Sequence, residues 1–83
     1  MDIRLTFFTK SDCELCDAAW FVVQKVVGRR DIPIDVVDLE SSGGARWAKE
    51  YGEHIPVLHV NGNEFCRHRV VEKDLRRALK GCD

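Results

Sequence analysis

The chain has 83 residues, of which 45% are hydrophobic and 33% are charged, and its formal net charge is -1. This length predicts one domain over residues 1–83 with a small core. The near-neutral charge gives no support to nucleic-acid binding, and no apolar run approaches the roughly 20 residues that cross a bilayer. We expect no nucleic-acid partner, no membrane partner, and no cleavable signal before the first strand.

The first two predicted elements are a strand and a helix. Residues 3–8, IRLTFF, alternate in polarity, which predicts a strand. Apolar side chains then recur at helical spacing over residues 15–27, and Gly28 is a natural stop. We expect Ser11 or Asp12 to cap this helix. The inward face should consist of Leu15, Ala18, Ala19, Val22, Val23, Val26 and Val27.

The rest of the chain predicts a strand, a helix, two strands and a helix, at residues 32–39, 45–51, 57–60, 63–68 and 71–80. The near-continuous Val and Ile content of IPIDVVDL indicates a strand that is buried on both faces. Asn61-Gly62 between two strand-like runs is a strong hairpin signal. The last helix should turn Val71, Leu75, Ala78 and Leu79 inward. This element order predicts an α/β fold with a mixed four-stranded sheet flanked by helices.

The cysteines indicate where the chemistry lies. The four are Cys13, Cys16, Cys66 and Cys82. A disulfide framework is typical of loop-rich secreted domains, whereas this chain has regular periodic elements and places two of its thiols in one C-x-x-C. Such usage fits a reducing compartment, so we expect a cytoplasmic protein.

The C-x-x-C pair falls where the first strand gives way to the first helix. Three residues of helix place two alpha carbons about 5 Å apart, within the range that a disulfide needs. The first helical turn has backbone N–H groups without intrahelical partners, and these groups stabilise a thiolate. Cys13 should therefore attack a disulfide, and the more shielded Cys16 should resolve the mixed disulfide. Lys10 could add a positive charge.

Acidic neighbours oppose this activation. Asp12, Glu14 and Asp17 surround the pair, and nearby negative charge raises the pKa of a thiol. We expect a pKa of Cys13 below that of free cysteine, but not at the very low end of the known range.

Two stretches of the chain resemble the glutaredoxins. Residues 9–16, TKSDCELC, resemble their active-site loop T-K-x-x-C-P-Y-C, and residues 55–62, IPVLHVNG, are similar to their x-V-P-x-V-F-I-N-G stretch. The resemblance implies a thioredoxin-like, glutaredoxin-type fold over essentially the whole chain. It also implies a cis bond at Ile55-Pro56 beside the cysteines, with the backbone of Ile55 pairing with an incoming substrate strand.

The chain departs from the glutaredoxin pattern in three places. Glu14-Leu15 replaces Pro-Tyr, the Gly-Gly and Asp that bind the far end of glutathione are absent, and a longer insert, FCRHRVVEKDL, occupies residues 65–75. With these features the chain looks most like a family of small, uncharacterised glutaredoxin-like domains. The external thiol reductant is therefore left open between glutathione and a thioredoxin reductase system.

Several other residues have simpler expected roles. We expect Cys66 to be a buried small hydrophobe and Cys82 to be a free thiol in the tail. His54, His59 and His68 lack the short spacing of zinc modules and are interpreted as surface residues, so no metal site is expected. The residues Trp20 and Phe21 lie off the core stripe of the first helix.

These features predict a thiol–disulfide oxidoreductase of glutaredoxin type, active in electron transport. Its substrate would be a protein or small-molecule disulfide, and it would hold no bound cofactor and act as a monomer. Two alternatives stay open: a chaperone for Cu(I) or another soft metal, which two thiolates also suit, and a non-catalytic thioredoxin-fold binding module.

Overall fold

The structure, a computed structural model, describes residues 3–80. Its elements are β1 (Leu5–Thr9), α1 (Glu14–Val27), β2 (Ile34–Asp38), α2 (Ala45–Tyr51), β3 (Val57–Val60), β4 (Asn63–Arg67) and α3 (Glu72–Ala78). Their order and type are those predicted from the sequence. Along this part of the chain, no helix is both long and apolar enough to cross a membrane.

The strands form one sheet of four in the order β2-β1-β3-β4. The β1–β2 pair is parallel, because α1 carries the chain back between the two strands, and the β1–β3 and β3–β4 pairs are antiparallel. Asn61 and Gly62 join β3 to β4 with positive φ angles of 53° and 84°. These are the signs that a type I′ hairpin turn requires. The predicted mixed sheet and hairpin are confirmed.

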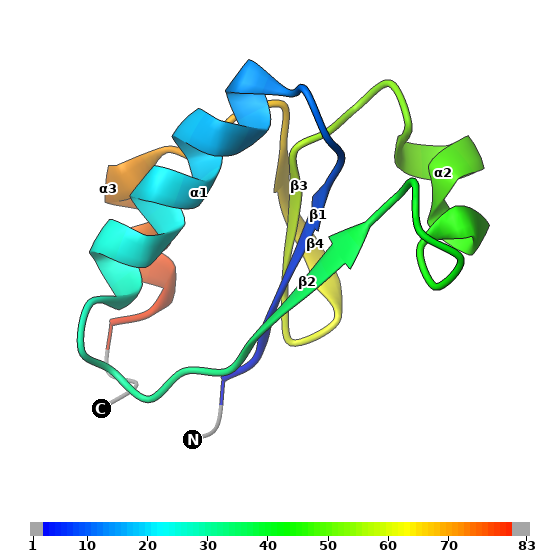
Figure 1. The fold of residues 1–83 in the computed structure, drawn as a ribbon. Helices are drawn as coiled ribbons and strands as arrows, with labels where there is room; N and C mark the ends of the chain where they lie inside the picture. The colour runs from blue at the N-terminus through cyan, green and yellow to red at the C-terminus, as the bar shows by residue number, and fades with distance from the viewer. Residues whose placement is uncertain (1–2, 81–83) are drawn as a thin grey trace.

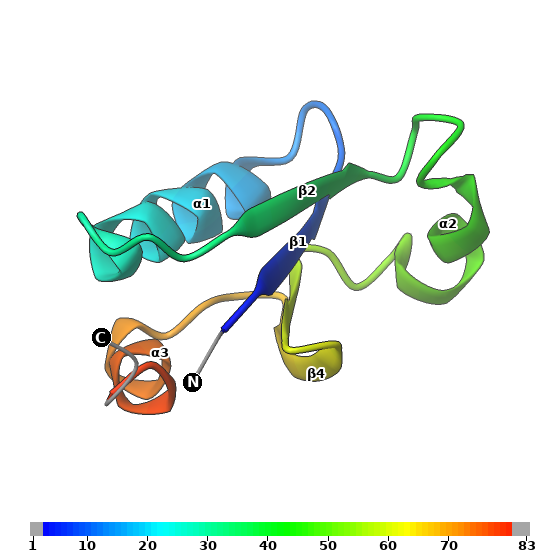
Figure 2. The same ribbon diagram turned by 90° about the horizontal axis from the view of Figure 1, so that it is seen from below.

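Helices cover both faces of the sheet. In Figures 1 and 2, α1 and α3 lie together on one side of the sheet and the short α2 lies on the other. The α1/α3 side holds the larger core cluster, in which Leu5, Val23, Leu58, Leu75 and Leu79 are fully buried. The α2 side holds a smaller cluster made of Phe8, Cys16, Leu39, Tyr51, Ile55 and Val57.

The prediction that β2 is buried on both faces is wrong. Asp35, Val36 and Asp38 are exposed, and the exposed fraction of Val36 is 54%. The reason is position, since β2 is an edge strand that pairs only with β1. The Val and Ile residues of β2 reflect the preference of β-branched side chains for extended backbone rather than burial.

The predicted inward faces of two helices also need correction. Leu15 is 59% exposed and Ala18 is exposed, whereas Cys16 takes a core position on α1. Val71 is 39% exposed because it is the residue that precedes α3 rather than part of its core face.

The two aromatic residues of α1 behave differently from each other. Phe21 is 68% exposed, as its place off the core stripe predicts. Trp20 is half-buried instead, with its ring 5.2 Å from the ring of Phe7. Only Phe21 therefore remains as an exposed aromatic side chain on this helix.

Candidate functional site

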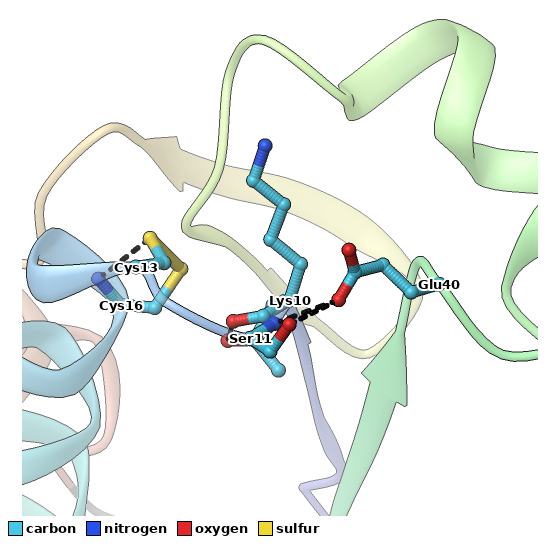
Figure 3. Close-up of a disulfide and its surroundings, with 6 residues drawn as sticks. Lys10, Ser11, Cys13, Cys16 and Glu40 are labelled. Carbon is cyan, nitrogen blue, oxygen red and sulfur yellow. Dashed lines mark hydrogen bonds between the residues drawn. A yellow bond between two sulfur atoms is a disulfide. The ribbon is translucent and has the colours of Figure 1, made fainter.

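Cys13 and Cys16 meet at the N-terminus of α1 and form a disulfide (Figure 3), with their alpha carbons 5.2 Å apart. Cys13 is itself the N-cap of the helix: its Sγ accepts a hydrogen bond from the backbone N–H of Cys16 at 3.1 Å. The prediction that Ser11 or Asp12 is the cap is therefore wrong. A sulfur atom fills the place that a serine or aspartate oxygen usually takes.

The two sulfurs differ in their exposure. Cys16 is 2% exposed and belongs to the smaller core cluster on the α2 side, whereas Cys13 is half-buried and packs against that cluster from outside. A molecule that approaches from solvent thus meets Cys13 first. One sulfur of the disulfide is thus accessible, and its partner is shielded.

The segment before β3 joins the core cluster that holds Cys16. The Ile55-Pro56 peptide bond is cis, and both side chains are buried, Ile55 in the same cluster as Cys16. The Pro56 carbonyl accepts a hydrogen bond from the backbone N–H of His68 at 2.7 Å. Residues from both halves of the chain therefore meet around the cysteine pair.

The loop before Cys13 is tied to a distant residue, Glu40. The backbone N–H of Ser11 donates to the Glu40 carboxylate at 3.1 Å, and the Ser11 hydroxyl donates to the same oxygen. These two hydrogen bonds, aided by the positive charge of Lys10, hold the pKa of the Glu40 carboxyl below its usual range. In Figure 3 the amine of Lys10 does not point toward the disulfide.

The acidic neighbours predicted from the sequence are present. Glu14 and Asp17 occupy the first turn of α1, where negative charge is favourable to the helix. Asp12 precedes them with a φ of 54°, a left-handed conformation that aspartate tolerates better than most residues. All three side chains are exposed, so solvent weakens but does not abolish their effect on a thiolate at Cys13.

Each of the three histidines lies within hydrogen-bonding distance of another side chain, and the prediction of surface exposure is wrong for one of them. His59 is 8% exposed, so the prediction of a surface residue is wrong for it. Its Nε2 lies 3.0 Å from the hydroxyl of Tyr51, and burial lowers its pKa. Nδ1 of His54 lies 3.2 Å from Nε2 of His68 at the surface. Within residues 3–80, no group of three or more His, Cys, Asp or Glu side chains is arranged to hold a metal ion.

Cys66, which was expected to be buried, is half-buried on β4 and packs against the larger core cluster rather than the one that holds Cys16. Burial, with the nearby charges of Glu64 and Asp74, raises the pKa of its thiol to about 11. A thiol with so high a pKa is a poor nucleophile at neutral pH. Cys82 lies outside the described residues.

Glu40 was missed from the sequence, and so was the capping role of Cys13. One rule could have drawn attention to Glu40: loops at the carboxyl ends of adjacent parallel strands lie side by side. β1 and β2 are such strands, and the N–H of Leu39 still bonds to the carbonyl of Thr9 at 2.9 Å where they end.

Comparison with known proteins identifies the fold. A family profile described as "Glutaredoxin-like domain (DUF836)" matches residues 4–80. The chain is 28% identical to protein XcR50 from X. campestris, with a TM-score of 0.71 over 90% of this chain and 93% of that one.

Two further structures are similar at lower identity, which shows the fold alone. A malarial protein is 22% identical, with a TM-score of 0.69 and 96% of each chain covered. Thioredoxin O2 from Arabidopsis thaliana in its oxidized state is 17% identical, with a TM-score of 0.67 over 94% of this chain and 72% of that one. The thioredoxin-type fold expected from the sequence is confirmed.

Proposed function

We propose that this chain, which belongs to the Glutaredoxin-like domain (DUF836) family, is a thiol–disulfide oxidoreductase that works through Cys13 and Cys16. The observation that supports this most is the disulfide at the start of α1, formed by an accessible cysteine and one that is 2% exposed. Nucleophilic attack needs an accessible sulfur, and release of the product needs a second thiol held within reach of the first.

The reaction has two steps. The Cys13 thiolate attacks one sulfur of a substrate disulfide, so that the substrate S–S bond breaks, a mixed disulfide forms, and the departing sulfur takes up a proton. The Cys16 thiolate then attacks Sγ of Cys13 and releases the second substrate thiol. In total two electrons pass from the protein dithiol to the substrate, and the protein is left with the 13–16 disulfide.

The N-cap hydrogen bond gives Cys13 its role in this scheme. The N–H of Cys16, which already points at Sγ of Cys13, would donate more strongly to a thiolate than to a neutral sulfur. The positive end of the α1 dipole acts in the same direction. Both effects favour the ionised form that attacks.

We propose that Ile55 and Pro56 bind the substrate. Among residues 3–80, no hydrogen bond uses the backbone N–H or C=O of Ile55, and this residue lies just before β3 begins. An extended substrate segment could pair with these two groups, as in strand addition to a sheet. The substrate would be a protein or small-molecule disulfide.

An external thiol would reset the pair, and we propose glutathione or a thioredoxin reductase system in the cytoplasm. The protein would need no bound cofactor and would act as a monomer in electron transport. The thiol usage of the chain supports this setting.

The test is the reduction potential of the pair in glutathione buffers, followed by turnover of insulin or hydroxyethyl disulfide. Each reductase system would be coupled in turn. We expect a reversible 13–16 disulfide and turnover with one of the two systems. Cys13→Ser should abolish turnover, Cys16→Ser should accumulate the mixed disulfide, and Cys66→Ser should behave as the wild type. A pair that does not oxidise reversibly would refute the proposal.

The same samples separate the alternatives. Tight binding of one Cu(I) without any disulfide reduction would support a soft-metal chaperone. However, α2 stands between β2 and β3, which interrupts the strand-strand order that such chaperones need. A wild type that forms no reversible 13–16 disulfide, or that turns over no disulfide with either system, would support a binding module.

A further inference from the structure

Glu40 reaches the cysteine loop because of the sheet topology. β1 and β2 are parallel neighbours, so the loops that follow Thr9 and Asp38 leave the sheet at the same edge. Ser11 and Glu40 are 29 residues apart in the sequence, yet both donors of Ser11 bond to one oxygen of the Glu40 carboxylate.

The segment that carries Glu40 is itself firmly held. The N–H of Glu40 donates to the Asp38 carboxylate at 2.8 Å, and the Ser41 hydroxyl donates to the Asp38 carbonyl at 2.6 Å. Gly44 packs so closely against this turn that a Cβ atom there would overlap the Asp38 carbonyl oxygen. Glu40 therefore extends from an anchored turn, and it can fix the position of the loop at residues 10–12.

Glu40 would also change the electrostatic potential at the Cys13 thiolate. Among the described residues, no ion pair or hydrogen bond involves the amine of Lys10, but its charge acts on the carboxylate of Glu40. Because Glu40 is ionised and lies beside the same loop, it offsets the positive charge that Lys10 would otherwise present to a thiolate. Its own negative charge further disfavours ionisation of Cys13.

We propose that Glu40 is a positioning residue for the redox pair, which fixes the Lys10–Ser11 loop in front of Cys13 and keeps the pair more reducing by opposing the charge of Lys10. This inference rests on the proposed function, because it concerns how the same pair is regulated.

The direction of the effect follows from charge. Glu40→Gln keeps an oxygen that can accept both hydrogen bonds from Ser11, but it removes the negative charge. The Cys13 thiolate should then be more stable, which favours the dithiol form over the disulfide and makes the pair more oxidising. For an exposed charge near the site, we expect a shift of about threefold in the equilibrium constant with glutathione, which is ~14 mV for a two-electron couple.

The experiment measures two quantities. The first is the equilibrium of the 13–16 disulfide with glutathione at pH 7, and the second is the pKa of Cys13, titrated by thiolate absorbance in a Cys16→Ser background. The variants are Glu40→Gln, Lys10→Met, their combination, and Glu50→Gln. Glu50 is an exposed residue of α2 and gives a matched control for the loss of one negative charge.

Three results together would support the inference. Glu40→Gln lowers the pKa of Cys13 and shifts the equilibrium toward the dithiol, Glu50→Gln changes neither quantity, and Lys10→Met shifts both quantities in the direction opposite to Glu40→Gln. The inference is overturned if Glu40→Gln leaves both quantities unchanged, or if Glu50→Gln changes them equally.

Failure of this inference and failure of the proposed function have different signatures. A wild-type pair that neither equilibrates with glutathione nor turns over with either reductase system would count against the proposed function. The thiolate titration would still test Glu40 in that case. Thermal unfolding by circular dichroism confirms that each variant is folded before it is compared.

Discussion

The contribution of the Cys13 cap can be measured as a difference in the free energy of unfolding between two variants. Its Sγ accepts the N–H of Cys16 at 3.1 Å, a donor that has no partner inside the helix. Cys13→Ser keeps an acceptor at this position, whereas Cys13→Ala removes it. Neither variant can form the 13–16 disulfide, so the difference between them reports the cap alone.

The expected difference follows from the cost of losing one N-cap. Replacing a good N-cap residue with alanine costs about 1 kcal/mol, within a range of roughly 0.5–2. For a domain of this size, that corresponds to a fall in Tm of about 4–8 °C. We expect Cys13→Ala to be less stable than Cys13→Ser by this amount, measured by urea and thermal denaturation under reducing conditions.

The reduced wild type adds a pH dependence. If the cap favours the thiolate, the pKa of Cys13 in the folded state lies below the unfolded value of about 8.5. The contribution of Cys13 to the free energy of unfolding should then rise with pH between these two values, level off above about 8.5, and be lost as pH falls through the folded pKa. Cys13→Ser should lack this rise.

Two outcomes would refute the reasoning. If Cys13→Ser and Cys13→Ala unfold at the same urea concentration, the hydrogen bond to Sγ contributes nothing to the helix. If the reduced wild type shows no gain in stability with pH, the helix terminus does not favour the thiolate. In either case the activation of Cys13 would need another source.

Three further predictions concern other parts of the molecule. Burial raises the pKa of Cys66 to about 11, so its thiol should react with a disulfide reagent at pH 8 far more slowly than reduced Cys13. The two rates are compared in a Cys82→Ser background, and equal rates would contradict the prediction. Leu75 is fully buried in the larger core cluster, so Leu75→Ala should lower the free energy of unfolding by about 2–5 kcal/mol, measured by urea denaturation. Lys73 is exposed, and a similar loss of stability in Lys73→Ala would show that core burial is not the cause. Burial lowers the pKa of His59, so folding should lose stability as pH falls below about 6.5, where the unfolded state binds the proton more readily; His59→Gln should weaken this loss, and an unchanged pH profile would count against it.

The sequence by itself determined the order of the elements, the sheet type and the cysteine pair. These features depend on neighbours along the chain: alternation gives the strands, helical spacing gives the helices, and Asn61-Gly62 gives the hairpin turn. The distance between the alpha carbons of Cys13 and Cys16 was also predictable, because it follows from helix geometry alone.

The tertiary structure decided which of these residues are covered and which charges meet. Val36 looks like a core residue in the sequence, but it is exposed because β2 is at the edge of the sheet. His59 looks like a surface residue, but it is buried against Tyr51. Periodicity reports which side of its own element a residue occupies, and only the packing of distant elements decides whether that side meets solvent.

Glu40 shows the same difference, at the site, between what the sequence predicts and what the fold decides. Nothing in its local sequence links it to Ser11, and their contact exists because two parallel strands end side by side. The identity of the two thiols was therefore determined by the sequence. The charges and hydrogen bonds around them were decided by the fold, because electrostatic interactions depend on distance in space rather than separation along the chain.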